Sequence, residues 1–356
     1  MSRTRDSFSS GLFGVLALPF LSASAGAYFI VQKTWRKVYE LELAKSHKAP
    51  IPVISVGNIA VGGTGKTPFV MYLVERLVEQ GLRPCVVSRG YRGTYSSDYV
   101  VVSDGSTMAP HVDATLVGDE PFLMACNLLN KAPVIVGRDR LKCVVFALKT
   151  FKSDVAVLDD GFQHLRLKRD VDIVLLSGKE DHMFPLGILR EPVSALSRAD
   201  ILVLNSDEEF VSDEIGDFLS SHPHYGYRSS PVSLLGKTAE DPPLDPSHLK
   251  GLDVLLVSAI ANPERFRKMS QALGWNVVDH LVFRDHHKYA PEDLSNILET
   301  ANGKNIIFTE KDWVKLPQHF RERDGIFFLK IGVGLERHER FLEQLLDLLK
   351  IHGPQS

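Results

Sequence analysis

A glycine-rich loop between a predicted strand and a predicted helix is the feature that most constrains the fold of this chain. Ile51-Pro-Val-Ile-Ser-Val-Gly-Asn58 has the apolar character of a buried strand, and it leads into Ala60-Val-Gly-Gly-Thr-Gly-Lys-Thr67. Closely spaced glycines let backbone N–H groups surround a phosphate, and the N-terminus of the following helix adds its positive dipole end. The order strand, glycine loop, helix therefore predicts a P-loop and a nucleotide-binding α/β domain.

The residues of this loop have distinct predicted roles. Lys66 can reach the β- and γ-phosphates, and the Thr67 hydroxyl can ligate Mg²⁺. The strict pattern has glycine where Ala60 stands, so the match is imperfect at the entry turn. We predict ATP as the nucleotide, Mg²⁺ as its metal, and the following residues as the phosphate cradle: Ala60, Val61, Gly62, Gly63, Thr64, Gly65, Lys66 and Thr67.

An acidic pair follows a second apolar strand. Val155-Ala-Val-Leu158 runs into Asp159 and Asp160. Ligands of an open α/β sheet bind at the carboxyl ends of its strands, where a P-loop enzyme presents a magnesium-binding carboxylate. Paired aspartates after a strand are otherwise common turn formers. The loop upstream favours the magnesium interpretation.

The rest of the chain has the pattern of a mostly parallel sheet covered by helices. Apolar, β-rich runs alternate with helical stretches, which is typical of α/β proteins. The polar stretch 226–250 contains Pro231, Pro242, Pro243 and Pro246, and it reads as an interdomain connection. We predict an N-terminal hydrophobic helix at 1–45, a nucleotide-binding core at 46–225, a linker at 226–250 and a smaller C-terminal α/β domain at 251–356.

Composition excludes several kinds of partner. The chain has 356 residues, a formal net charge of −3, 44% hydrophobic residues and 24% charged residues. Because there is no global basic field, nucleic acid is not expected as a partner, and no protein partner is evident either. Cys85, Cys126 and Cys143 form no metal-ligand or disulfide pattern, so we expect buried, reduced thiols.

The N-terminal segment predicts contact with a membrane. Residues 11–31 carry no charge over about twenty positions, the length that a helix needs to cross a bilayer. Small and polar residues dilute this stretch, so spanning the bilayer and lying shallow in it both stay open. More cations follow it than precede it, which places the body on the cytoplasmic side. A cleaved signal peptide is the alternative, but it would leave an ATP site where ATP is absent. A helix buried against the body also fits.

The motifs that follow the P-loop resemble those of a known family. They are, in order, Gly62-Gly-Thr-Gly-Lys-Thr-Pro68, Ser88-Arg-Gly-Tyr91, Gly118-Asp-Glu-Pro121, Asp159-Asp-Gly-Phe-Gln-His164, Leu189-Arg-Glu-Pro192, Asp285-His-His287 and Thr309-Glu-Lys-Asp312. Their order resembles the tetraacyldisaccharide 4'-kinases of lipid A biosynthesis. The resemblance runs from about residue 36 to residue 315, and the N-terminal hydrophobic segment also fits the family pattern.

This resemblance implies an activity and an architecture. ATP and Mg²⁺ would phosphorylate the 4'-hydroxyl of a tetraacylated glucosamine disaccharide 1-phosphate and form lipid IVA. The reaction would take place at the cytoplasmic face of the inner membrane, with the glycolipid and the membrane lipid as partners. A P-loop kinase core would be joined by a two-stranded linker to the smaller C-terminal domain, with the active site in the cleft between them.

The resemblance also implies roles for residues outside the loop. Asp119 would be the catalytic carboxylate, paired with His286, although the choice among Asp285, His286 and His287 stays open. Glu191 would help to hold the metal. The remaining assignments place Asp159 and Asp160 at the magnesium and phosphates, and Arg140 and Gln163 at the phosphoryl site. The family run Pro-x-Gly-Pro-Leu-Arg-Glu-Pro has Ile188 in its fourth position here, which puts only the loop in doubt.

Two other functional classes fit a P-loop. A membrane-associated ATPase or regulator would have water as its only acceptor, and it would not need Asp119 as a base. A non-catalytic nucleotide-sensing scaffold would not depend on Lys66. The guanine-reading motif Asn-Lys-x-Asp does not appear, since the nearest sequence, Thr309-Glu-Lys-Asp312, lacks the asparagine. A GTPase is therefore disfavoured.

Overall fold

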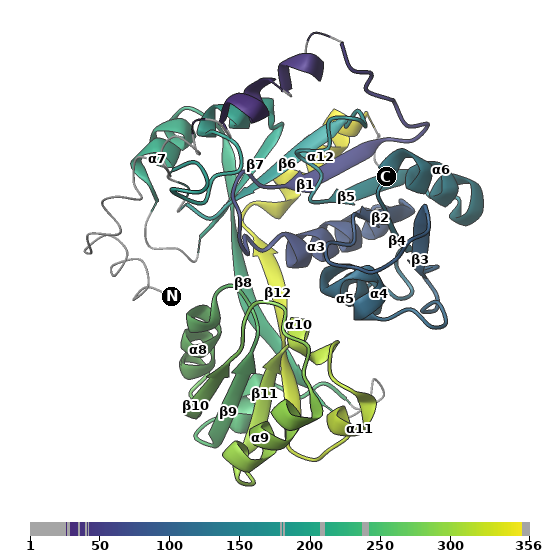
Figure 1. Cartoon of the computed structure of the whole chain (residues 1–356). Helices are drawn as coiled ribbons and strands as arrows, with labels where there is room; N and C mark the ends of the chain where they lie inside the picture. The colour runs from purple at the N-terminus through teal and green to yellow at the C-terminus, as the bar shows by residue number, and fades with distance from the viewer. Residues whose placement is uncertain are drawn as a thin grey trace.

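One mixed β-sheet runs through the whole molecule (Figure 1). The computed structural model describes residues 26, 29–34, 36–39, 41, 43–178, 180, 182–206, 211–236 and 242–350. Among these residues the sheet has twelve strands in the order β10-β9-β11-β12-β8-β7-β6-β1-β5-β2-β4-β3. Two halves of unequal size share it, and only β8 and β12 reach from one half to the other (Figure 1).

The larger half is an open, mostly parallel sheet with helices on both faces (Figure 1). Every strand pair within it is parallel except β3 with β4. The central strands are buried along their whole length, as expected for a sheet covered on two faces. Its strands are β1 Val53–Gly57, β2 Pro84–Ser88, β3 Tyr99–Ser103, β4 Val134–Gly137, β5 Val155–Asp159, β6 Val171–Leu176 and β7 Ile201–Asn205. Its helices are α3 Lys66–Glu79, α4 Ala114–Val117, α5 Asp119–Asn127, α6 Arg140–Phe151, the 3₁₀ helix η1 Val193–Arg198 and α7 Asp213–Ser220.

The smaller half repeats the α/β arrangement around a core of its own. Parallel strands β10 and β11 flank β9, and buried apolar residues pack on each face of this sheet. The strands are β9 Asp253–Ser258, β10 Asn276–Val282 and β11 Asn305–Thr309. The helices are the 3₁₀ helix η2 Pro246–Leu249, α8 Pro263–Ala272, α9 Pro291–Ala301, α10 Glu310–Trp313 and α11 Gln318–Arg321.

An antiparallel ribbon connects the two halves. It consists of β8 His224–Leu235 and β12 Ile326–Leu335, paired from Tyr227 opposite Leu335 to Leu235 opposite Phe328. Because β12 ends in the larger half, the helix that follows it, α12 His338–Leu349, packs there with its buried Phe341, Leu345 and Leu349. The predicted range 251–356 thus contains a final helix that belongs to the core of the other half.

The stretch predicted as a linker begins as a strand. Residues 226–235 lie in β8, and Pro231 sits opposite Ile331 where the register of the ribbon shifts. The middle of β8 is largely solvent-accessible, so it lacks the apolar alternation that marks a half-buried strand in a sequence. This exposure explains why the sequence pattern indicated a connection. The predicted mostly parallel α/β sheet is confirmed.

The predicted N-terminal hydrophobic helix falls mainly outside the described residues, because residues 1–25 are not among them. Of the residues that the structure describes, no helix is both long enough and apolar enough to cross a membrane. Two cysteines, Cys85 and Cys143, are buried as expected. Cys126 is exposed, contrary to the prediction, because it lies on the open side of α5.

Candidate active site

The glycine loop leaves the carboxyl end of β1 and enters α3 at Lys66. Gly62 has φ 117° and Gly65 has φ 80°, a backbone conformation that residues with a Cβ rarely adopt. A Cβ on Gly65 would also lie 2.5 Å from the hydroxyl of Tyr227 in the ribbon. That hydroxyl donates a hydrogen bond to the carbonyl of Thr64, so a side chain of the ribbon holds the backbone of the loop. The predicted strand–loop–helix geometry is therefore present.

Ala60 departs from the strict pattern without distorting the loop. It is fully buried, forms a bridge with Leu189, and is not among the residues with positive φ. The next residue, Val61, donates its N–H to the carbonyl of Ile188 at 2.7 Å. Residues 188 and 189 thus contact the start of the loop through their backbone. The hydrogen bond from Val61 therefore does not depend on the side chain of Ile188.

The acidic pair after β5 lies beside the loop because β1 and β5 are parallel neighbours. Val56 is paired with Asp159 in register, which brings the carboxyl ends of both strands to one edge. Lys66 Nζ lies 3.3 Å from Asp160 Oδ1, and Arg190 Nη1 lies 3.1 Å from Asp160 Oδ2. Burial raises the pKa of Asp160, but the cations Lys66 and Arg190 outweigh it and hold the pKa at about 2. This carboxylate stays ionised at physiological pH.

Asp159 has the opposite electrostatic environment. Its side chain is buried and accepts a hydrogen bond from Ser88 Oγ at 2.8 Å. Burial raises the pKa of Asp159 to about 6, and the carboxylates of Glu120 and Asp160 add to the increase. Two adjacent aspartates thus have pKa values far apart, a pattern typical of functional sites. The contribution of Glu120 also shows that the start of α5 faces the nucleotide end of the cleft.

Arg140 and Gln163, predicted at the phosphoryl site, and Glu191, predicted at the metal, are close to this edge. Arg140 is buried and donates from Nη2 to the carbonyl of Asp160 at 3.1 Å, while its buried Nη1 has no hydrogen-bond partner. Gln163 Nε2 lies 2.8 Å from the carbonyl of Asn58 and 2.9 Å from Glu191 Oε1. The second oxygen of Glu191 is paired with Arg198. Glu191 is therefore held by two side chains.

The donors at this edge suit a hard cation. Thr67, Asp159 and Asp160 offer oxygen atoms only, which Mg²⁺ prefers. Among the described residues, no group of three or more His, Cys, Asp or Glu side chains is arranged to hold a metal ion. Protein oxygens alone would therefore leave the coordination sphere incomplete, as is usual for Mg²⁺ that also binds substrate phosphates and water. The donor atoms of these residues fit a nucleotide-bound Mg²⁺.

A carboxylate–histidine pair lies across the cleft between the halves. Asp119 is the first residue of α5 in the larger half, and His286 follows β10 in the smaller half. His286 Nδ1 lies 2.9 Å from Asp119 Oδ2, and the two side chains are 17% and 14% exposed, respectively. His286 has φ 151°, a strained value for a residue with a side chain. The predicted pairing of Asp119 with His286 is present in the geometry.

The neighbouring histidine has a separate set of contacts. His287 Nε2 lies 2.7 Å from Asp293 Oδ2, and its ring stacks on Phe283. It therefore faces the start of α9. Since the side chains of adjacent residues diverge, only the fold could decide which of the two histidines meets Asp119.

Sequence reasoning assigned no role to several charged residues around this pair. Lys311 Nζ lies 3.4 Å from Glu120 Oε1, 3.4 Å from Asp285 Oδ1 and 3.5 Å from His286 Nε2. Arg92 donates to the carbonyl of Asp285 at 3.3 Å. The available signal was positional, because Lys311 is the second residue after β11, in the motif Thr309-Glu-Lys-Asp312.

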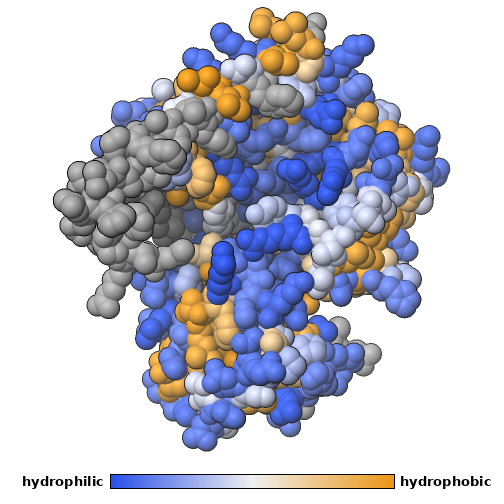
Figure 2. Space-filling view, in the orientation of Figure 1, coloured by the Kyte–Doolittle hydropathy of each residue, from blue (hydrophilic) through white to orange (hydrophobic). Residues whose placement is uncertain are grey.

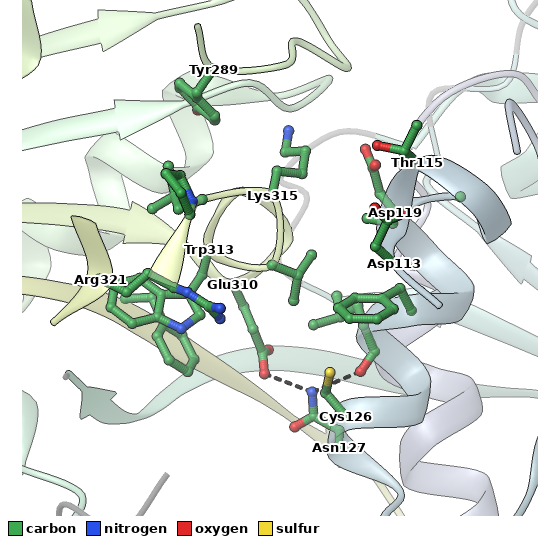
Figure 3. Close-up of a pocket in the computed structure, with 18 of the residues that line it drawn as sticks. Asp113, Thr115, Asp119, Cys126, Asn127, Tyr289, Glu310, Trp313, Lys315 and Arg321 are labelled. Carbon is green, nitrogen blue, oxygen red and sulfur yellow. Dashed lines mark hydrogen bonds between the residues drawn. The ribbon is translucent and has the colours of Figure 1, made fainter. Parts of the chain in front are cut away.

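A cavity of about 920 Å³ opens beside the Asp119–His286 pair. Figure 3 shows Asp119 and Thr115 on one wall and Trp313, Glu310 and Arg321 on the wall across from them. Asn127 of α5 donates to Glu310 Oε1 at 2.8 Å and joins the walls at one end. Asp119 and His286 line the cavity, whereas no residue of the glycine loop does. The glycine loop therefore lies outside the cavity that Asp119 and His286 line.

The surface of the junction is polar. Figure 2 shows mostly hydrophilic residues where the two halves meet on this face of the molecule. Such a surface suits a charged, hydrogen-bonding ligand between the halves. The arrangement as a whole can bind a triphosphate at one end and deprotonate a hydroxyl group at the other.

Comparison with known proteins gives consistent matches. A family model described as tetraacyldisaccharide-1-P 4'-kinase matches residues 17–350. A tetraacyldisaccharide 4'-kinase of Halothermothrix orenii is 37% identical over 328 residues, covering 85% of this chain and 84% of that protein. A tetraacyldisaccharide 4'-kinase of Aquifex aeolicus is 37% identical over 308 residues, covering 85% of this chain and 90% of that protein.

A solved structure has the same fold. It is described as an "apo" form of LpxK from Aquifex aeolicus in complex with ATP at 2.2 Å resolution. The TM-score is 0.75 at 33% sequence identity, and the match covers 94% of this chain and 99% of that one. The similarity therefore includes both halves and the ribbon between them.

Proposed function

The chain belongs to the tetraacyldisaccharide-1-P 4'-kinase family, and we propose that its cleft transfers the γ-phosphate of ATP to the 4'-hydroxyl of a tetraacyldisaccharide 1-phosphate. The product is lipid IVA, a precursor in lipid A biosynthesis. The enzyme is thus a phosphotransferase with an alcohol group as acceptor. The related LpxK structure in complex with ATP supports ATP as the phosphoryl donor.

The nucleotide end uses the glycine loop and its cations. The backbone of residues 60–65 surrounds the phosphates, and Lys66 moves from Asp160 to the transferring group when ATP arrives. Arg140 has a buried, unpartnered Nη1 beside the acidic pair, so it can receive a phosphate oxygen. Cations placed before the reaction lower the free energy of the charge that develops during transfer.

Thr67, Asp159 and Asp160 would hold Mg²⁺ at this end. When bound, Mg²⁺ would neutralise negative charge on the phosphates. The raised pKa of Asp159 falls when a cation binds beside it, which favours the ionised carboxylate needed there. Glu191 would help to hold the metal through oxygens that already accept from Gln163 and pair with Arg198. Gln163 joins Glu191 to the residue that precedes the loop, because its Nε2 donates both to Glu191 and to the carbonyl of Asn58.

The acceptor end uses Asp119 as a general base. Its carboxylate accepts the proton of the 4'-hydroxyl while that oxygen attacks the γ-phosphorus, and the bond from the γ-phosphorus to the β-phosphate oxygen breaks and releases ADP. The contact with His286 Nδ1 fixes the orientation of the carboxylate. Because His286 comes from the smaller half, the base is correctly placed only when the halves are together, and closure around ATP keeps water from competing with the sugar.

The acceptor also determines where the enzyme works. A lipid with four acyl chains resides in the bilayer, and exposing its chains to water costs about 0.8 kcal/mol per methylene. An enzyme that binds the lipid at the cytoplasmic face of the inner membrane avoids this free-energy cost and has access to cytoplasmic ATP. The uncharged N-terminal residues 11–31, mainly outside the described residues, are our candidate for the anchor.

The observation that carries the proposal is the presence of both ends in one cleft, with Lys66 beside Asp160 and Asp119 beside His286. The test is a transfer assay with γ-labelled ATP, Mg²⁺ and tetraacyldisaccharide 1-phosphate in detergent micelles. Wild-type protein should label the lipid, and Lys66→Met should lower the rate by roughly 10²–10³-fold or more because it removes the cation at the phosphates.

The matched control is Lys142→Met, which removes a lysine from an exposed pair with Asp98 and should leave the rate unchanged. Release of labelled phosphate without labelled lipid would favour the ATPase alternative. Labelled lipid in equal amounts from Lys66→Met would contradict the role of the loop.

A further inference from the structure

The cavity beside the Asp119–His286 pair has a cation on its far wall. Arg321 lines the same cavity of about 920 Å³ as Asp119 and His286. Figure 3 shows Asp119 and Arg321 on opposite walls, one from α5 of the larger half and the other from α11 of the smaller half. A carboxylate and a guanidinium therefore face one cavity from two sides.

Arg321 has no counter-ion among the residues that the structure describes. Its Nε is buried without a hydrogen-bond partner, and its guanidinium forms no ion pair with any described carboxylate. Burial lowers the pKa of Arg321, because part of its charge is removed from water. A partly desolvated, unpaired guanidinium is stabilised by an anion that reaches it.

The fold holds Arg321 in place. It ends α11, where its backbone N–H donates to the carbonyl of Pro317 at 3.2 Å, and the preceding Phe320 is buried. The guanidinium lies over the ring of Trp313, 5.9 Å from the centroid. Trp313 in turn packs on Phe328 of the ribbon, with ring centroids 4.9 Å apart. Because this side chain is already oriented, a ligand that binds it loses little conformational entropy.

The other charges of the far wall offset one another. Lys315 Nζ lies 2.6 Å from Oδ1 of the buried Asp312. Burial raises the pKa of Glu310, and the nearby charge of Lys330 opposes that increase. Among the described residues of this wall, Arg321 is therefore the cation whose charge is left for a ligand.

The proposed acceptor matches this arrangement. Its 4'-hydroxyl is on one sugar and its phosphate is on carbon 1 of the other, so the reacting group and the anion are at opposite ends of the disaccharide. Building on the proposed kinase activity, we propose that Arg321 binds the 1-phosphate of the acceptor while the 4'-hydroxyl meets Asp119. A guanidinium binds a phosphate through two parallel N–H···O bonds.

This contact selects the acceptor and sets its direction in the cavity. A disaccharide in the reverse direction would bring its phosphate to the carboxylate of Asp119, which repels it. A glycolipid without the phosphate would leave the guanidinium of Arg321 unpaired. Arg321 is thus a specificity-determining residue, and it takes no part in the transfer step.

The test compares two acceptors that differ only in the 1-phosphate. Transfer from γ-labelled ATP is measured with tetraacyldisaccharide 1-phosphate and with the same lipid after removal of that phosphate, each over a range of mole fractions in detergent micelles. For the wild-type protein, KM should be about tenfold or more higher without the phosphate, because a charge-assisted hydrogen-bonded pair is lost.

Arg321→Met should remove this preference. Its KM for the phosphorylated acceptor should rise by about the same factor, and its KM for the other acceptor should stay at the wild-type value. The kcat should change little, since the phosphate is bound equally before and during transfer. Arg321→Lys keeps the charge but not the paired donors, so its KM for the phosphorylated acceptor should lie between those of the wild type and Arg321→Met.

The matched control is Arg323→Met. Arg323 is exposed, follows α11 and is not among the residues that line the cavity. Both KM values of this variant should equal those of the wild type.

A purely structural role for Arg321 gives a different result. If Arg321 only covers Trp313, Arg321→Met will change KM for the two acceptors by the same factor, and that outcome would overturn the proposal. A wild-type KM that does not depend on the 1-phosphate would overturn it as well. Arg321→Gln gives a second neutral variant if the methionine variant does not fold, with the same expected change. Failure of the wild-type protein to phosphorylate either lipid would instead contradict the proposed function.

Discussion

The two ends of the cleft differ in how the chain builds them. The nucleotide end comes from one half, where residues 57–67 are contiguous and Asp159 is brought alongside by direct pairing of β1 with β5. The acceptor end needs both halves, because Asp119 begins α5 whereas His286 and Lys311 come from the smaller half. The loop also approaches the smaller half, since a Cβ on Gly63 would lie 3.8 Å from the Cβ of Ala261. We therefore propose that ATP binding depends mainly on one half, while phosphoryl transfer requires that the ribbon hold the two halves in register.

This difference assigns separate tasks to the two halves. A phosphate site formed by backbone and a short loop depends on local geometry, so it tolerates changes in the other half. A base oriented from the opposite side of a cleft responds to every contact that sets the distance between the halves. The charge of Glu120 links the two ends, since it contributes to the raised pKa of Asp159.

The largest effect that separates the two ends is expected at Asp119. Asp119→Asn keeps the shape of the side chain but removes the base, so transfer to the lipid should fall by roughly 10²–10⁴-fold. Affinity for ATP should stay within about twofold, since Asp119 touches no residue of the glycine loop in the contacts that the structure describes. Transfer assays and calorimetric ATP titration on the same preparation check both. A comparable loss of ATP affinity would show that the two ends are not separable.

A smaller effect should appear in stability at the nucleotide end. Because burial raises the pKa of Asp159 to about 6, above roughly 3.9 in an unfolded chain, its charge destabilises the folded state above pH 6. Asp159→Asn removes that charge. The free energy of unfolding without nucleotide should increase by about 1–3 kcal/mol at pH 8, and this gain should shrink as the pH falls from 6 to 4. Urea unfolding at pH 8 and pH 4.5 measures it.

Asp160 provides the matched control with the opposite sign. Its pKa is held at about 2, below its ordinary value, so its ionised form stabilises the folded state above pH 4. Asp160→Asn should therefore lower the free energy of unfolding at pH 8. If the free energy of unfolding at pH 8 falls in both asparagine variants, the charge of Asp159 does not destabilise the folded state as we infer.

The same contrast explains what the sequence could predict. The P-loop and the aspartates at 159 and 160 were predictable because a strand, its loop and a parallel neighbour meet at one sheet edge. The order of motifs also pointed to Asp119 and His286 through the family resemblance. The choice between His286 and His287 needed the packing of Phe283 and Asp293, which hold His287 away from the cleft.

Other features had no adequate signal in the sequence. The ribbon strand β8 is accessible along its middle, so its own pattern did not indicate a strand, and only the family resemblance implied a two-stranded linker. Helix α12 follows β12, which runs from the smaller half into the larger one. Because the sequence does not show where β12 ends in space, it could not predict that α12 packs beside Phe69 and Tyr225. Lys311 became notable only when three segments converged on its ammonium. The roles assigned to Arg140, Gln163 and Glu191 stay predictions.

The most direct test of a nucleotide end formed mainly by one half and an acceptor end shared by two is His286→Asn. Its ATP dissociation constant and its rate of lipid phosphorylation should be measured on one preparation. We expect the dissociation constant to stay within about twofold and the transfer rate to fall about 10²-fold or more, because only the orientation of Asp119 is lost. Wild-type transfer, or a loss of ATP affinity as large as the loss of rate, would contradict this division of the cleft.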